Sequence, residues 1–219
     1  MRVFITGATG YVGINLALQL AGEGHTVHAL CRSRKKARLL AHENIKVFLG
    51  DILDEESIDK AMVTCTHVFH LAAYVSVWAK DPQTYFRINV GGAENILKAA
   101  KKHGVQRVVV TSTAGVFGPS EPGEEVNEVK RRTIPYFNEY EISKAQVHEK
   151  VAEYVAMGLD ALVVCPTRIY GPGLISESNS VTKMIDLYLR GKWHLLPGNG
   201  TKLGNYVYID DVVNGHIFA

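Results

Sequence analysis

The sequence predicts an α/β fold, a Rossmann-type doubly wound parallel sheet, on the strength of three observations. Short apolar runs rich in β-branched residues alternate with helical patterns along most of the 219 residues. A glycine-rich turn joins the first of these runs to a helix, as in nucleotide-binding parallel sheets. The run Arg107–Ser112 is apolar almost throughout, which is typical of a central strand covered on both faces.

Six strands are expected, with helices between them where the apolar residues recur at helical spacing. The expected strands are Val3–Thr6, Thr26–Cys31, Ile45–Leu49, His67–Leu71, Arg107–Ser112 and Ala161–Cys165. Asp81-Pro82 predicts a helix start, since an N-cap carboxylate precedes proline at the first helical position. That helix is expected to run to about His103, and its internal pair Gly91-Gly92 indicates close packing against a neighbour. Tyr140–Met157 is expected to form another long helix.

The pattern changes after Pro166, which predicts a small second unit that follows the sheet. Its expected elements are a loop at Gly171–Gly173, a helix over Val181–Arg190, a strand over Val207–Ile209 and a final helix capped by Asp210. The chain ends at Ala219 within that last helix, so this unit is expected to be incomplete.

Composition and charge exclude several classes of protein. The net charge is only +2, and the basic run Arg32–Arg38 has no interleaved aromatic residues, so no nucleic-acid partner is expected. No apolar run approaches the ~20 residues of a membrane span, and the N-terminus lacks a signal-peptide pattern. Cys31, Cys65 and Cys165 lie far apart without metal-ligand spacing. We therefore expect free thiols, no metal and a cytoplasmic location.

The turn Thr6–Gly13 carries the glycine spacing Gly-x-x-Gly-x-x-Gly between a strand and a helix. Gly7 permits the tight turn, Gly10 lets backbone approach a pyrophosphate, and Gly13 lets the helix pack closely on the strand. The helix N-terminus offers free N–H groups and a positive dipole end to an anion. A merely structural turn is the alternative, but the strand-then-helix context favours a dinucleotide site. The expected contacts are Gly7, Thr9, Gly10, Tyr11, Val12 and Gly13.

The end of the second strand indicates which dinucleotide is bound. Cofactor sites for NAD usually place a carboxylate there, whereas this chain has Cys31 followed by Arg32. An arginine binds a 2′-phosphate with charge-assisted hydrogen bonds. NADP(H) is therefore the preferred cofactor, with NAD(H) possible and with Arg34 and Lys36 as weaker candidate contacts. The alternative is a solvated basic helix face.

Two further strand ends are expected to contact the cofactor. Asp51 can accept a hydrogen bond from the adenine amino group while Ile52 lies against the ring. Alternatively, Asp51 caps the next helix, although Asp54 could fill that role instead. Small residues after His70 let backbone approach the cofactor ribose. His70 itself is expected in the core. The contacts expected after the fourth strand are Leu71, Ala72 and Ala73.

Tyr140 and Lys144 lie one helical turn apart, so both project from one face of the helix. An ammonium near a phenol lowers the pKa of the phenol and makes it a general acid or base. Lys144 can also hold the hydroxyls of the nicotinamide ribose. Such a pair is often only a surface pair, but here it follows the hydroxyl-rich end of the fifth strand. From that strand end we expect Thr113, or alternatively Ser112, to hydrogen-bond the substrate carbonyl; Asn89 is either part of a proton relay or a packing group.

Taken together and in this order, these motifs resemble the extended short-chain dehydrogenases, the superfamily of NAD-dependent epimerase/dehydratases. Val164–Gly173 is similar to the nicotinamide-side loop of that superfamily, and Tyr206–Asp211 is similar to its late strand–helix motif. Val110–Gly115 together with Arg32 resembles the dihydroflavonol-reductase-like and 3β-hydroxysteroid-dehydrogenase-like branch. Members of the superfamily continue well beyond the last motif. The expected nicotinamide-side contacts are Thr111, Pro166, Thr167 and Ile169, beside Tyr140 and Lys144.

The resemblance implies an NADP(H)-dependent oxidoreductase that reduces a small carbonyl compound or oxidises the corresponding alcohol. An NAD(P)-dependent sugar-nucleotide epimerase or dehydratase shares most of these motifs and is the alternative; a non-catalytic NADP-sensing regulator is less favoured. Residues 1–165 are expected to form the NADP-binding domain with the catalytic pair, and residues 166–219 the start of a substrate-binding lobe. A homodimer through the helices around Ala93 and Val147 is possible. The loops expected to line the substrate pocket are Tyr74–Trp78, Gly115–Asn138 and Leu174–Lys192.

Overall fold

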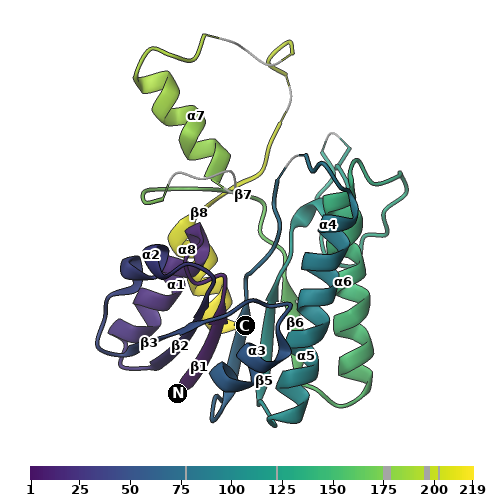
Figure 1. The fold of residues 1–219 in the computed structure, drawn as a ribbon. Coiled ribbons are helices and arrows are strands. Elements are labelled where there is room, and N and C mark those ends of the chain that lie inside the picture. The colour runs from purple at the N-terminus through teal and green to yellow at the C-terminus, as the bar shows by residue number, and fades with distance from the viewer. Residues whose placement is uncertain (77, 122, 175–178, 195–197, 202) are drawn as a thin grey trace.

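The computed structural model describes residues 1–76, 78–121, 123–174, 179–194, 198–201 and 203–219 (Figure 1). Its main feature is a six-stranded sheet in the order β3-β2-β1-β4-β5-β6, in which every neighbouring pair is parallel. This order is that of a Rossmann doubly wound sheet, so the predicted fold is confirmed. The strands are β1 (Arg2–Thr6), β2 (Thr26–Cys31), β3 (Ile45–Leu49), β4 (His67–His70), β5 (Arg107–Thr111) and β6 (Ala161–Val164).

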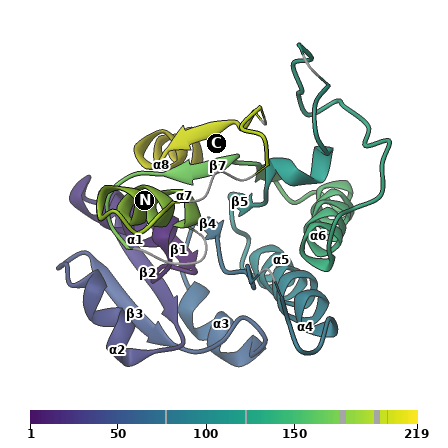
Figure 2. The ribbon, with the colours of Figure 1, turned by 90° about the horizontal axis from the view of Figure 1, so that it is seen from above.

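Helices cover both faces of this sheet, and Figure 2 shows α3, α5 and α6 on one side with α1 and α8 on the other. Side chains alternate between the two faces, so Phe4 and Val68 pack under α3 and α5 while Val3 and Ile5 pack under α1. Because both faces are covered, a ligand can reach the sheet only at the strand ends. The helices are α1 (Tyr11–Gly22), α2 (Arg34–Ala37), η1 (Arg38–Leu40), α3 (Glu55–Met62), η3 (Ala114–Phe117), α6 (Glu139–Ala156) and α8 (Ile209–Phe218).

The helix expected between Asp81 and His103 forms as one run with an irregular middle. It comprises α4 (Gln83–Tyr85), a π-helical turn η2 (Phe86–Gly91) and α5 (Gly92–Lys102). The Asp81 carboxylate accepts a hydrogen bond from the Gln83 N–H at 3.0 Å, as expected of a capping residue. A Cβ at Gly92 would lie 2.4 Å from Cδ1 of Ile52, so the glycine does mark a close contact. The π turn places Asn89 inside the protein, facing α6.

The C-terminal segment contains one strand that was not expected. Residues 168–170, predicted within a loop, form β7 (Arg168–Tyr170), which pairs in parallel with β8 (Tyr206–Tyr208). The predicted cap at Asp210 is also wrong, because α8 begins at Ile209 and Asp210 lies in its first turn. There the carboxylate still favours the positive end of the helix dipole. Figure 1 shows α7 (Ser180–Leu189) standing away from the main sheet, above the strand ends.

The helices considered for subunit pairing, those around Ala93 and Val147, are α5 and α6. Ala93 and Val147 themselves point into the core and are buried, so a pairing would have to use other residues of these helices. A homodimer stays a prediction. Within the described part of the chain, no helix is both long enough and apolar enough to cross a membrane.

Candidate active site

A cavity of about 860 Å³ lies at the carboxyl ends of the strands and receives residues from the end of each of the six strands of the main sheet. The sheet order brings these ends together, since parallel strands all finish at the same edge. Every residue expected to bind cofactor or to act in catalysis lines this cavity. They are Gly7, Thr9, Gly10, Tyr11, Val12, Gly13, Arg32, Asp51, Ile52, Leu71, Ala72, Ala73, Thr111, Thr113, Tyr140, Lys144, Pro166, Thr167 and Ile169.

The glycine turn has almost no space for side chains. Gly7 has a φ of +69°, and a Cβ there would lie 2.7 Å from the Ala72 nitrogen. A Cβ at Gly13 would lie 2.1 Å from the Gly7 oxygen, which accepts the Gly10 N–H at 2.8 Å. Gly10 is the N-cap of α1, and among the described residues no side chain caps this terminus. The first N–H groups of α1 therefore remain available to an anion.

Thr6 ties the ends of β1 and β4 together beside this turn. Its hydroxyl oxygen accepts the Ala72 N–H at 3.2 Å and lies 2.7 Å from Nδ1 of His70. His70 is buried, and burial together with the nearby Lys144 lowers its pKa to about 3. It is a neutral core histidine, as the sequence led us to expect.

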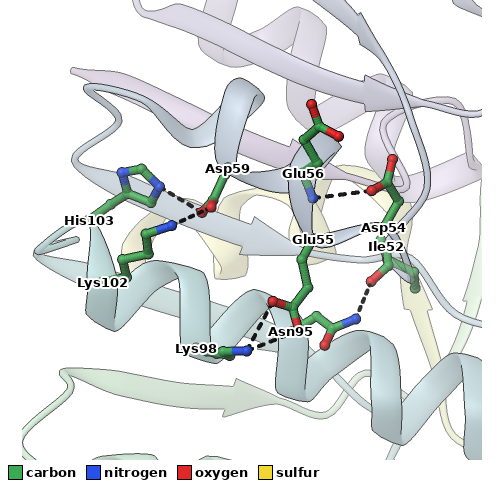
Figure 3. A network of polar contacts seen from close by, with 9 residues as sticks. All are labelled: Ile52, Asp54, Glu55, Glu56, Asp59, Asn95, Lys98, Lys102 and His103. Atoms are coloured by element: carbon green, nitrogen blue, oxygen red, sulfur yellow. Dashed lines mark hydrogen bonds and ion pairs between the residues drawn. The ribbon is translucent and has the colours of Figure 1, made fainter.

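After β3, Asp51 does not cap α3. The cap is Asp54, whose carboxylate accepts the Glu56 N–H at 3.1 Å, while one oxygen of Asp51 accepts the Leu53 N–H at 2.9 Å. The alternative role considered for Asp51 is therefore wrong, and this residue lines the cavity. The following residue is held in place by α5, since Asn95 donates to the Ile52 carbonyl at 3.0 Å (Figure 3).

Ion pairs link α3, which follows the turn at Asp51, to α5 and to His103. Figure 3 shows Lys98 paired with Glu55, and Lys102 and His103 both directed at Asp59. The hydrogen bond from Lys102 lowers the pKa of Asp59, and His103 adds to the same effect. These exposed pairs are worth little individually, but together they link α3 to α5.

The basic run after β2 is only partly directed into the cavity. Arg32, Ser33 and Lys36 line it, and the Ser33 hydroxyl caps the short helix α2. Arg34, one of the weaker candidates, is exposed and lies outside the cavity lining. Arg32 and Lys36 are thus the two cations of the run that can meet a phosphate group bound at this edge.

The structure corrects the expected relation between the two catalytic candidates. Lys144 is buried, donates to the Thr111 carbonyl at 2.7 Å, and has its pKa lowered to about 8 by burial. Burial, followed by the charge of Glu141, raises the pKa of Tyr140 to about 12 instead of lowering it. Removing both groups from water outweighs the attraction that the spacing suggested. The Tyr140 phenol is therefore fully protonated at neutral pH.

The hydroxyls after β5 differ in what they bind. Thr113 accepts the Gly115 N–H at 3.2 Å, which leaves its own proton free for an oxygen in the cavity. Ser112 is buried, and its hydroxyl lies 2.8 Å from Nε2 of His148. This comparison favours Thr113 over Ser112 as the donor to a substrate. The sequence motifs did not single out His148 as a partner of Ser112, although it lies one helical turn after Lys144 and therefore on the same side of the helix.

Asn89 uses its whole amide to hold neighbouring segments. Its oxygen accepts the Tyr74 N–H at 2.7 Å, and its nitrogen donates to the Tyr74 carbonyl at 3.2 Å and to the Ser143 hydroxyl at 2.9 Å. Ser143 lies between Tyr140 and Lys144 on α6. Of the two readings considered for Asn89, these contacts support the packing group.

The expected substrate loops reach the cavity only in part. Tyr74, Val75 and Val181 line it, whereas no described residue of the segment Gly115–Asn138 does. Val77 and residues 175–178 lie outside the described residues. Ser180 of the expected loop Leu174–Lys192 and Arg168 of the nicotinamide-side loop also line the cavity. Four lining residues belong to no motif or loop expected at the site: Leu30, Ser33, Leu53 and Ile88.

The buried ammonium predicts that Lys144→Met stabilises the cofactor-free protein at pH 7. Below pH 8 the native state carries a charge that burial disfavours, so removing it raises the free energy of unfolding by at most on the order of 3 kcal/mol, less the lost hydrogen bond. Between pH 8 and the ordinary pKa of 10.5, Lys144 stays protonated only in the unfolded state, so the wild-type protein becomes more stable as the pH rises. The stability advantage of Lys144→Met therefore shrinks over this range.

Urea unfolding at several pH values measures this difference, and the control is Lys150→Met, a lysine of the same helix that is partly exposed and paired with Glu94 and Glu153. A Lys144→Met protein that is less stable at pH 7, or a difference independent of pH, would contradict a lysine disfavoured by burial.

Comparison with known proteins agrees with this geometry. Residues 3–219 match the NAD dependent epimerase/dehydratase family, a span that includes the glycine turn, the Tyr140–Lys144 pair and the late strand–helix motif. The chain belongs to this family. Proteins similar to this member of the epimerase/dehydratase family include dehydrogenases, reductases and epimerases.

Individual relatives are similar over nearly the whole chain. A 3β-hydroxysteroid dehydrogenase/Δ5→4-isomerase of Mycobacterium tuberculosis is 31% identical over 100% of this chain and 60% of its own length. A bifunctional dihydroflavonol 4-reductase/flavanone 4-reductase of Malus domestica is 30% identical over 99% of this chain and 67% of its own length. The UDP-glucose 4-epimerase of Thermus thermophilus, solved in complex with NAD, superposes with a TM-score of 0.87 at 28% identity, covering 100% of this chain and 74% of that one. The chain spans 60–64% of the length of the first three curated relatives.

Proposed function

We propose that this chain carries the cofactor site and catalytic centre of an NADP(H)-dependent oxidoreductase that reduces the carbonyl group of a small organic molecule. One observation carries the proposal: Tyr140, the buried Lys144, the free hydroxyl of Thr113 and the glycine turn all line one cavity. The named activities of the dehydrogenase and reductase relatives support it. The enzyme would act in the cytoplasm, where its three cysteines remain free thiols.

The residues present fit a dinucleotide. Side chains are excluded at Gly7 and Gly13, so that backbone alone meets the pyrophosphate at the start of α1. Asp51 and Ile52 would hold the adenine, and Thr111 with Pro166–Ile169 would hold the nicotinamide end. When bound, NADPH supplies the hydride for the carbonyl carbon.

The side chains of the chain itself supply the proton and the orientation. Thr113 donates a hydrogen bond to the substrate oxygen, and Tyr140 gives that oxygen a proton as negative charge develops on it. Lys144, fixed by the Thr111 carbonyl, keeps its remaining N–H groups for the ribose hydroxyls and for the phenolate that Tyr140 becomes. A phenol pKa of about 12 keeps the proton on Tyr140 at neutral pH, as a general acid for carbonyl reduction requires.

A screen of NADPH oxidation tests this function against flavonoid, steroid, aldehyde and sugar-nucleotide panels. The apolar residues Tyr74, Val75 and Val181 at the cavity lead us to expect turnover with an apolar ketone or aldehyde. Activity confined to the sugar-nucleotide panel would contradict the proposal.

Arg32→Asp is expected to reverse the cofactor preference. The carboxylate would repel a 2′-phosphate and accept the 2′-OH of NADH, so KM for NADPH should rise by at least ~10-fold while KM for NADH falls. Steady-state kinetics with both cofactors measures the change. Arg34→Asp makes the same charge change at an exposed residue that does not line the cavity, so the ratio of the two KM values should change by about 2-fold at most. An unchanged KM for NADPH in Arg32→Asp would contradict the assignment of Arg32 as the residue that binds the 2′-phosphate.

A second candidate is a sugar-nucleotide epimerase, favoured by the likeness to the Thermus epimerase at 28% identity. Such an enzyme recycles its cofactor without releasing it. Purified protein that retains one equivalent of NAD(H) and interconverts UDP-sugars without net oxidation would support this candidate. Free exchange of NADPH supports the reductase.

A further inference from the structure

The segment between η3 and α6 carries an arginine that no sequence motif indicated. The side chain of Arg132 is only 7% exposed, and each of its three guanidinium nitrogens has a partner. It donates to the carbonyls of Ile134 at 3.0 Å, Gly115 at 2.6 Å and Pro135 at 2.8 Å, and it pairs with a carboxylate oxygen of Glu141 at 3.0 Å. Burying a guanidinium is costly, and these contacts offset that cost only in a single geometry.

Two aromatic rings also pack against the guanidinium of Arg132. The Arg132 carbon Cζ lies 4.4 Å from the ring centre of Tyr136 and 5.1 Å from that of Phe137. The Phe137 N–H in turn donates to Glu141 at 3.1 Å, and Glu141 donates its own N–H to the capping Asn138 at 2.9 Å. The start of α6 is therefore built around the Arg132–Glu141 pair.

The pair joins the two segments that carry the proton chemistry. Gly115, whose carbonyl binds Arg132, follows Thr113 by two residues, and Glu141 directly follows Tyr140. A Cβ at Gly115 would lie 3.4 Å from the Glu141 carboxylate, so the two segments are in close contact. Arg132 lies at the junction of the strand end that presents Thr113 and the helix start that presents Tyr140.

We propose that Arg132 is a positioning residue for the active site, which fixes Tyr140 relative to Thr113 and neutralises the carboxylate of Glu141 beside the phenol. The inference rests on the proposed function for its consequence in catalysis. Its electrostatic part, however, concerns a titration that needs neither substrate nor cofactor.

The charges around Tyr140 determine the sign of the effect. Glu141 and Lys144 belong to α6, Arg132 comes from the preceding segment, and His70 and Cys165 lie at the ends of β4 and β6 near Lys144. Loss of Arg132 would leave the carboxylate of Glu141 without its cationic partner, disfavour the phenolate and raise the pKa of Tyr140 further.

The test is a ¹⁹F NMR titration of protein labelled with 3-fluorotyrosine, in which Tyr140→Phe identifies the resonance. In Arg132→Gln the midpoint of Tyr140 should move upward by on the order of one pH unit. It should return toward wild type in Arg132→Gln/Glu141→Gln. Arg131→Gln, a neighbouring exposed arginine, is the matched control and should leave the midpoint unchanged.

An unchanged midpoint in Arg132→Gln, or no return in the double variant, would overturn the inference. If Arg132→Gln does not fold, Glu141→Gln alone should lower the midpoint, and an unchanged value there would overturn it equally. With an identified substrate, Arg132→Gln should lower kcat while leaving KM for NADPH within about 2-fold, and Arg132→Lys should restore part of kcat. Failure of the proposed function appears separately, as full turnover by Tyr140→Phe.

Discussion

Tyr140→Phe is expected to lower kcat for carbonyl reduction by about 10²–10⁴-fold, the usual contribution of a positioned general acid. The change removes only the hydroxyl, and the ring remains packed at the start of α6, so the fold and the cofactor site should persist. The Kd for NADPH, measured by fluorescence titration, should stay within about 2-fold of wild type because the proton donor does not carry the binding energy.

Tyr154→Phe is the matched control for this change. It removes a tyrosine hydroxyl from the same helix, but Tyr154 packs against the core below α5 and lies outside the cavity lining. Its kcat should equal that of wild type. Substantial turnover by Tyr140→Phe would show that another group provides the proton.

Gly13→Ala is expected to disrupt the phosphate turn itself. The new Cβ would meet the Gly7 oxygen at 2.1 Å and the Gly7 carbon at 2.8 Å, and backbone atoms cannot swing aside as a side-chain end can. Overpacking of this kind costs about 1–3 kcal/mol. Because the same oxygen closes the turn that faces the pyrophosphate, we expect NADPH affinity to fall by about 10- to 100-fold.

Gly22→Ala provides the control for Gly13→Ala. Gly22 ends the same helix, and a Cβ there meets nothing within 4 Å. Alanine should leave NADPH binding unchanged and raise stability by up to about 1 kcal/mol, since it is the better helix former. NADPH titration and thermal unfolding measure the affinity and the stability of both variants. An equal loss of NADPH affinity in Gly13→Ala and Gly22→Ala would show that this turn does not make the phosphate site.

The sequence could predict most of the main sheet because local signals agree there with tertiary packing. The expected strands match β1 to β6 within one residue at either end, since each is an apolar run bounded by polar or glycine residues. The strand β7 escaped prediction because Arg168–Tyr170 is short and partly exposed, and its partner β8 lies far along the chain. The π-helical turn around Asn89 likewise depends on contacts with Tyr74 and α6.

The candidate site was predictable as a set of residues but not in its electrostatics. Parallel strands bring their carboxyl ends to one edge, so Arg32, Asp51 and Thr113 could be expected at the same edge of the sheet. The contacts that each of these residues makes with other segments could not be predicted from spacing along the sequence. Burial reverses the expected pKa shift of Tyr140, and Arg132 depends on contacts with both Gly115 and Glu141.

A crystal structure of the protein with NADP⁺ tests most directly whether this cavity is a nicotinamide site facing Tyr140 and Lys144. We expect the pyrophosphate at the first turn of α1, the 2′-phosphate beside Arg32, and the nicotinamide ring within reach of the Tyr140 hydroxyl and Thr113. A nicotinamide directed away from Tyr140, or a dinucleotide bound outside the glycine turn, would contradict the account.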